Sequence, residues 1–133
     1  METRNERRPL SPHLTIYRPQ LTSVLSILHR ITGLSLLISA VLVILWFFSI
    51  AMGEEYYIWY SEFVISIPCQ LILILSIWAI WYHTFTGIRH LIWDTGHGFE
   101  LNTAAAYGYV VGGASVVFTV IAWIAAYSNI GAM

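Results

Sequence analysis

Five ionisable side chains lie within or at the edge of long apolar segments of this sequence. They are His29, Arg30, His83, Arg89 and His90. An ionisable group inside a lipid bilayer is costly to bury, so each of them is by default a candidate functional residue. Imidazole is a common metal ligand, and the guanidinium group suits carboxylates and other oxygen-rich partners. The residue types therefore indicate metal coordination next to an oxygen-rich ligand.

His83 is the strongest candidate for a metal ligand. If its helix leaves the membrane near Trp93, about ten residues later, His83 lies roughly 15 Å deep at 1.5 Å per residue. A neutral imidazole at that depth needs a partner for each nitrogen, and haem iron commonly takes axial histidines. Gly87, one turn further on the same face, would let a flat macrocycle approach the backbone. The alternative is a buried histidine bonded to a carbonyl or to a hydroxyl such as that of Thr84 or Thr86.

His90 follows His83 by seven residues and shares its helical face, nearly two turns closer to the membrane surface. We therefore expect it to contact a haem propionate or to support the site without binding iron. It also precedes Asp94 by four residues, the spacing at which side chains on a helix meet. An interfacial pair between His90 and Asp94 is the alternative.

Ser26 and Arg30 are four residues apart and so share one face of a helix. A hydroxyl and a guanidinium group at the membrane edge can bond the carbonyl oxygens of a quinone or the carboxylates of haem propionates. The alternative for Arg30 is a side chain that extends to the lipid headgroups. We expect this headgroup contact more strongly for Arg89.

The depth of His29 bears on how a haem would be held. If its helix starts near Ser23, counting residues places His29 several ångströms shallower than His83. Two axial ligands of one iron need similar depth. The sequence therefore predicts that the ligand opposite His83 comes from another chain.

Long uncharged segments must position these side chains. Apolar residues make up 58% of the 133 positions and charged residues only 10%, whereas soluble domains average about a quarter charged. Spanning the hydrocarbon core takes about 20 helical residues. We predict an all-α integral membrane protein with three transmembrane helices at about 23–52, 63–93 and 103–128. Residues 1–22 form an N-terminal arm, and the anchor domain covers 23–133.

The distribution of charge predicts the orientation. All six basic residues are arginines; five precede or begin the first helix, the sixth ends the second, and the first connection has only acids. Because positive residues stay cytoplasmic, the N-terminus is predicted to face the cytoplasm. A net charge of −1 argues against nucleic-acid binding. The single cysteine, Cys69, excludes an internal disulfide, c-type haem attachment and a cysteine-ligated iron–sulfur cluster within this chain.

Three motifs resemble those of a known family. Residues 8–17 (RPLSPHLTIY), 26–33 (SILHRITG) and 83–94 (HTFTGIRHLIWD) are similar to the cytochrome b556 membrane anchors of succinate dehydrogenase, respiratory complex II. The motifs occur in the family's order, and the layout of three spans matches the whole chain. The resemblance implies a non-catalytic subunit in a heteromeric helical bundle. Its expected partners are a flavoprotein, an iron–sulfur protein and a second anchor.

The resemblance also implies roles for individual residues. The first histidine of the family's His-x-x-x-Gly-x-x-His pattern is an axial ligand of a b-type haem shared with the second anchor, which corresponds to His83. Ser26 and Arg30 correspond to residues of the ubiquinone site, and His29 and Arg30 would reach the haem propionates. The N-terminal arm would lie against the iron–sulfur subunit.

Other functions fit the same residues. One is a stand-alone b-type electron carrier that binds haem within itself or in a homodimer, and another is a haem-free anchor that recruits a soluble enzyme. A fumarate reductase-type anchor also fits, because the sequence leaves the direction of electron flow, the quinone type and the association of whole complexes open. The short, polar N-terminal segment favours a bacterial inner membrane over a mitochondrial one.

Overall fold

Helices make up all the regular structure that the computed structural model describes, which covers residues 18–130. The helices are α1 (Leu21–Met52), α2 (Glu54–Ile65), α3 (Ile67–Asp94) and α4 (Leu101–Ile130). The helices α1, α3 and α4 are long and apolar enough to cross a membrane. The prediction of an all-α chain with three spans is confirmed. The motif at 8–17 and most of the N-terminal arm lie outside the described residues.

The first connection differs from the expected one because it is itself a helix. Gly53 has a φ of 110°, a left-handed backbone that ends α1 and that only glycine adopts without strain. Glu54 and Glu55 then occupy the first turn of α2, where negative charge favours the helix dipole. Ser66 is extended, and α3 follows from Ile67 instead of from about 63.

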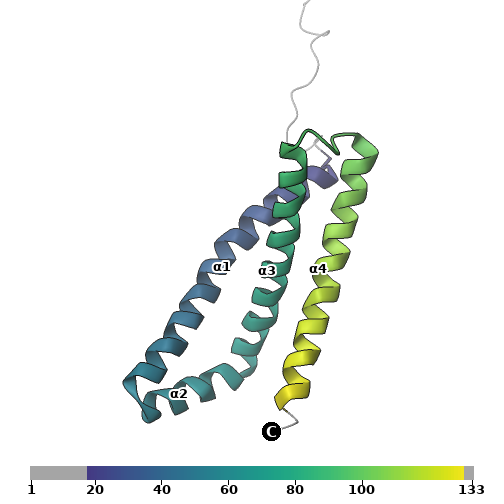
Figure 1. Cartoon of the computed structure of the whole chain (residues 1–133). Coiled ribbons are helices and arrows are strands. Elements are labelled where there is room, and N and C mark those ends of the chain that lie inside the picture. Colours follow the sequence, from purple (N-terminus) through teal and green to yellow (C-terminus); the bar gives the residue numbers. More distant parts are fainter. Residues whose placement is uncertain (1–17, 131–133) are drawn as a thin grey trace, which may run out of the picture.

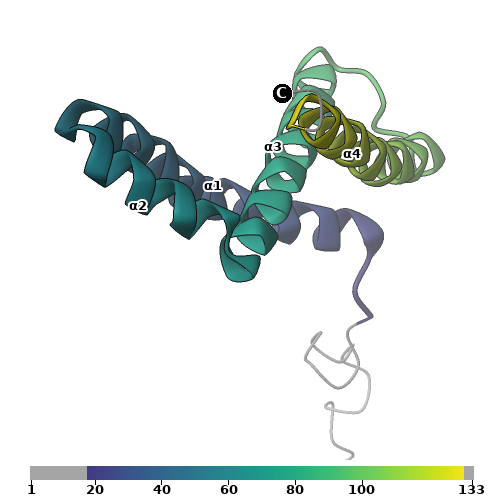
Figure 2. The same ribbon diagram turned by 90° about the horizontal axis from the view of Figure 1, so that it is seen from below.

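The helices α1 and α3 lie close at one end and diverge toward the other, which gives the bundle a wedge shape (Figure 1). In Figure 1, α3 and α4 run side by side, while α1 crosses α3 at the end that carries the N-terminus and then leans away. The view from below in Figure 2 shows α1 and α2 extending to one side of the α3–α4 pair. Only Leu25, Thr32, Leu42 and Ser49 of α1 are buried. Most of α1 is therefore left for lipid or another chain.

A small core joins the three spans near their crossing. Tyr82 is 1% exposed and packs with Leu25 and Val111, one residue from each long helix. Its hydroxyl donates a hydrogen bond of 3.1 Å to the carbonyl of Leu25. This core fixes the N-terminal part of α1 against α3.

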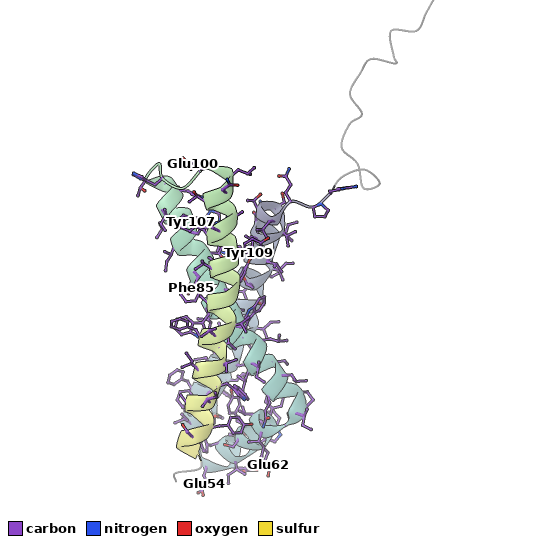
Figure 3. All side chains as sticks on the ribbon, turned by 90° about the vertical axis from the view of Figure 1, so that its right-hand side faces the viewer. Glu54, Glu62, Phe85, Glu100, Tyr107 and Tyr109 are labelled. Atoms are coloured by element: carbon purple, nitrogen blue, oxygen red, sulfur yellow. The ribbon has the colours of Figure 1, made fainter. Side chains whose placement is uncertain are left out.

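The opposite end of α1 is held by α2. Tyr60 is buried, and its hydroxyl donates a 2.8 Å hydrogen bond to the carbonyl of Leu42. Burial, with a smaller contribution from the Cys69 thiol, raises the pKa of Tyr60. Three acidic side chains lie at the ends of the described bundle, with Glu54 and Glu62 at one end and Glu100 at the other (Figure 3).

Arg89 does not reach out to headgroups, and that expectation was wrong. Its side chain is 3% exposed, and Nη2 donates a 3.1 Å hydrogen bond to the carbonyl of Ala104 on α4. Its guanidinium carbon lies 4.1 Å from the centroid of the Trp93 ring. The first turns of α4 cover this arginine, which a count of residues along α3 does not reveal.

We expect Arg89→Ala to lower the stability of the detergent-solubilised protein by about 2 kcal/mol. The substitution removes a hydrogen bond from a charged donor and a desolvated cation–π contact. Chemical denaturation followed by circular dichroism would measure the effect. Leu91→Ala is the control, because Leu91 lies on the same helix but is 65% exposed. Equal stability of the two variants would contradict a structural role for Arg89.

Candidate functional site

The imidazole rings of His29 and His83 stack where α1 crosses α3. Their centroids are 3.9 Å apart and the ring planes differ by 11°. The two histidines therefore lie at the same level, and the expectation that His29 is several ångströms shallower was wrong. Residue counting assumes parallel helices, whereas α1 is inclined to α3 (Figure 1).

The backbone of α1 holds one nitrogen of His83. Its Nδ1 lies 3.1 Å from the carbonyl oxygen of His29 and 3.4 Å from Oγ1 of Thr32. A carbonyl only accepts hydrogen bonds, so Nδ1 carries the ring proton and Nε2 has the lone pair. Within residues 18–130, Nε2 has no hydrogen-bond partner. Metal-binding histidines commonly donate their other N–H to a carbonyl in this way.

Of the explanations open for His83, the bond to a carbonyl is present at Nδ1, and it leaves Nε2 for a ligand. Thr86 does not bond the ring, because its hydroxyl donates to the carbonyl of Tyr82 at 2.7 Å. One ring nitrogen is satisfied by protein and the other is presented as a ligand, which suits an axial position on haem iron. No group of three or more potential metal-binding side chains occurs among the described residues. A haem takes one ligand from each side, so this chain needs to supply only one, and His83 would be that ligand.

The stacked rings restrict what His29 can do. Two imidazoles that held one metal ion from opposite sides would each point a nitrogen at the ion between them. Face-to-face rings such as those of His29 and His83 do not have this geometry. The buried Nδ1 of His29 has no hydrogen-bond partner in the described part of the chain.

Two glycines border His83 differently. A methyl group added at Gly33 would lie 2.9 Å from Cε1 of His83, so the ring fits against α1 only because that residue has no side chain. An added methyl at Gly87 meets nothing within 4 Å, which leaves that face of α3 open. Close approach of a macrocycle at Gly87 stays a prediction. The role of Gly33 was not foreseen, although a glycine inside a helix costs about 1 kcal/mol relative to alanine and so calls for a packing reason.

A cavity of about 390 Å³ lies beside the stacked histidines, between α1 and α3. It is lined by Thr22, Ser23, Ser26, Ile27, Arg30, Arg89, His90 and Trp93. The structure thus brings the predicted residues Ser26, Arg30 and His90 to one cavity.

His90 connects this cavity to the stacked pair. Its ring centroid is 5.4 Å from that of His29, and it meets the Trp93 ring nearly edge-on at 5.2 Å. Trp93 is itself fixed, because its indole N–H donates a 3.1 Å hydrogen bond to the carbonyl of Gly98. Within the described residues, His90 makes this ring contact and forms no ion pair with Asp94.

The cavity combines hydroxyl groups with cationic groups at the edge of an apolar bundle. Arg30 is exposed and Ser26 half-buried, so both can be reached from outside the chain. Such a set can donate hydrogen bonds to carbonyl oxygens or carboxylates. The site as a whole therefore places one candidate metal ligand, His83, next to a pocket that suits an oxygen-rich, partly apolar molecule.

Comparison with known proteins gives consistent similarities over most of the chain. The profile of the succinate dehydrogenase/fumarate reductase transmembrane subunit family matches residues 4–122. The succinate dehydrogenase cytochrome b556 subunit of Rickettsia bellii (strain RML369-C) is 43% identical over 118 residues, covering 89% of this chain and 92% of the relative. The cytochrome b560 subunit of Reclinomonas americana is 42% identical, covering 90% and 87%. The cytochrome b556 subunit of Paracoccus denitrificans is 38% identical, covering 86% and 88%.

Proposed function

Because this chain belongs to the succinate dehydrogenase/fumarate reductase transmembrane subunit family, we propose that it anchors a succinate:ubiquinone oxidoreductase in the membrane and binds a b-type haem through His83. It is a multi-pass membrane protein with three apolar spans. The observation that carries the proposal is the hydrogen bonding of the two nitrogens of the His83 ring. Its Nδ1 is bonded to the carbonyl of His29, which leaves Nε2 as the ligand atom.

The haem would supply one-electron chemistry through its iron when bound. His83 would hold it from one side, and the opposite ligand would come from a second anchor subunit that shares the group. His29 and Arg30 would contact its propionates, with His90 next to them. Carboxylates suit this role because the cavity beside the rings presents Arg30 and Arg89, and no acidic side chain lines it.

Ser26 and Arg30 would bind ubiquinone in the cavity between α1 and α3. The Ser26 hydroxyl would donate a hydrogen bond to a quinone carbonyl, and the Arg30 guanidinium would favour the negative charge that develops on the oxygen during reduction. The overall step adds two electrons and two protons to the quinone, giving the quinol. The electrons come from succinate oxidation elsewhere in the complex, so this chain catalyses nothing alone.

The proposed partners are a flavoprotein, an iron–sulfur protein and the second anchor. The surface of α1 supports a partner within the membrane, because 4 of its 32 residues are buried within this chain. Affinity purification through a tag on this chain tests the assignment. We expect the flavin and iron–sulfur subunits to co-purify with a low-spin haem. Purification of the chain without them would favour a stand-alone carrier, and the absence of a Soret band would favour a haem-free anchor.

We further propose a bacterial inner membrane with the N-terminus in the cytoplasm, which the arginine distribution supports. Cysteine labelling in a Cys69→Ser background tests the orientation. His97 lies in the connection between α3 and α4, and Glu55 lies in α2 at the other end. We expect His97→Cys to react with an impermeant maleimide only in inside-out vesicles and Glu55→Cys only in right-side-out vesicles. The reverse pattern would contradict the orientation.

A further inference from the structure

The turn of α1 at residues 29–33 surrounds the His83 ring on several sides. The ring of His29 covers one face at 3.9 Å, and the carbonyl of His29 accepts the Nδ1 proton at 3.1 Å. Gly33 borders Cε1 so closely that an added methyl would lie 2.9 Å away. Thr32 is 2% exposed and places its hydroxyl 3.4 Å from Nδ1.

The Thr32 hydroxyl also bonds the carbonyl of His29, which is the group that accepts the Nδ1 proton of His83. It donates a 2.9 Å hydrogen bond to the carbonyl oxygen of His29. Its own oxygen can then accept a share of the Nδ1 proton, which gives a closed set of hydrogen bonds among Thr32, His29 and His83. Such a set fixes both the tautomer and the rotation of the imidazole.

We propose that Thr32 and Gly33 are positioning residues that orient the His83 imidazole for ligation of iron. Neither would bind the metal: Gly33 leaves space for the ring against the helix, and Thr32 completes the hydrogen bonds at Nδ1. The inference rests on the proposed role of His83 as haem ligand. It extends that role to two residues of α1, so the orientation of a ligand on α3 is set by a different helix.

The proposal predicts weaker haem binding when the Thr32 hydroxyl is removed or when a side chain is added at Gly33. Substituting residues that support a metal ligand typically weakens metal binding by 10- to 100-fold. In the purified complex, we expect Gly33→Ala to speed haem transfer to excess apomyoglobin by roughly tenfold. Thr32→Val should speed it several-fold and shift the low-spin electron paramagnetic resonance signal, which reports the orientation of the axial imidazole. Thr32→Ser should restore both, because it returns the hydroxyl.

Matched controls make the same changes elsewhere. Gly113→Ala adds a methyl on α4, where an added carbon meets nothing within 4 Å. Thr119→Val removes a buried hydroxyl that bonds the carbonyl of Ser115. Both controls should keep wild-type transfer rates and signals. If Thr32→Val and Gly33→Ala match these controls, the positioning role is overturned.

A His83→Ala complex separates this proposal from the one it depends on. If His83→Ala removes the low-spin signal while the α1 variants match their controls, only the positioning role fails. If His83→Ala leaves the signal unchanged, the ligand assignment itself is wrong and the positioning role falls with it. Should Gly33→Ala not assemble, the Thr32 series decides the question alone.

Discussion

Replacing His83 with alanine is expected to remove the low-spin, bis-histidine haem spectrum of the assembled complex or convert it to another form. The reason is the loss of the proposed ligand atom Nε2, which belongs to a ring whose Nδ1 is held by the carbonyl of His29. Reduced-minus-oxidised absorption spectra and electron paramagnetic resonance of purified complex would measure the change.

His90→Ala is the matched comparison for that result. His90 lies on the same helix, but its ring packs edge-on against Trp93 and its place in the cavity suits a propionate. We expect His90→Ala to preserve most of the low-spin spectrum. His97→Ala, in the exposed connection, should preserve all of it. A normal spectrum in His83→Ala would refute the ligand assignment.

Loss of Ser26 or Arg30 is expected to slow ubiquinone reduction by roughly ten- to a hundredfold. Hydrogen bonds to charged partners contribute about 1.5–3 kcal/mol, and each 1.4 kcal/mol corresponds to about tenfold in rate. Both residues line one cavity at the end of α1. Succinate oxidation by an artificial dye that accepts electrons before the membrane subunits should survive in Ser26→Ala and Arg30→Leu.

The ratio of quinone-linked to dye-linked activity in assembled complex is the decisive quantity. Ser35→Ala is a control on the same helix, because its hydroxyl donates to the carbonyl of Thr32 and lies outside the cavity. Arg18→Leu is the corresponding control for an exposed arginine ahead of α1. Haem content is measured alongside, since Arg30 also faces the propionates in the proposed site. A wild-type ratio in both Ser26→Ala and Arg30→Leu would place the quinone elsewhere.

The sequence predicted the three spans because lipid-facing helices need long uncharged segments. Segments of that length and composition have few other structural interpretations. It did not predict α2, because the segment after Gly53 mixes acids and aromatic residues without a clear helical period. A left-handed glycine and an extended Ser66 define that helix, and neither backbone angle can be derived from residue types alone.

The sequence predicted most residues of the candidate site, but it did not predict how they lie relative to one another. Periodicity along one helix placed Ser26 with Arg30 and His83 with His90. The stacking of His29 on His83 depends on how α1 crosses α3, and the burial of Arg89 depends on where α4 covers it. Contacts between helices of this kind are absent from any pattern read along a single helix.

The wedge between α1 and α3 has a consequence for bilayers of different thickness. With 32 residues, α1 is about 48 Å long, against a hydrocarbon core of roughly 30 Å, and a long helix accommodates this difference by tilting. Its fixed point is the crossing that carries His29, Thr32 and Gly33. We expect a thinner or thicker bilayer to change the tilt of α1 about this crossing, which would move the far end of α1 together with α2. The proposed haem and quinone site would then keep its depth while the other end of α1 adjusts to the lipid.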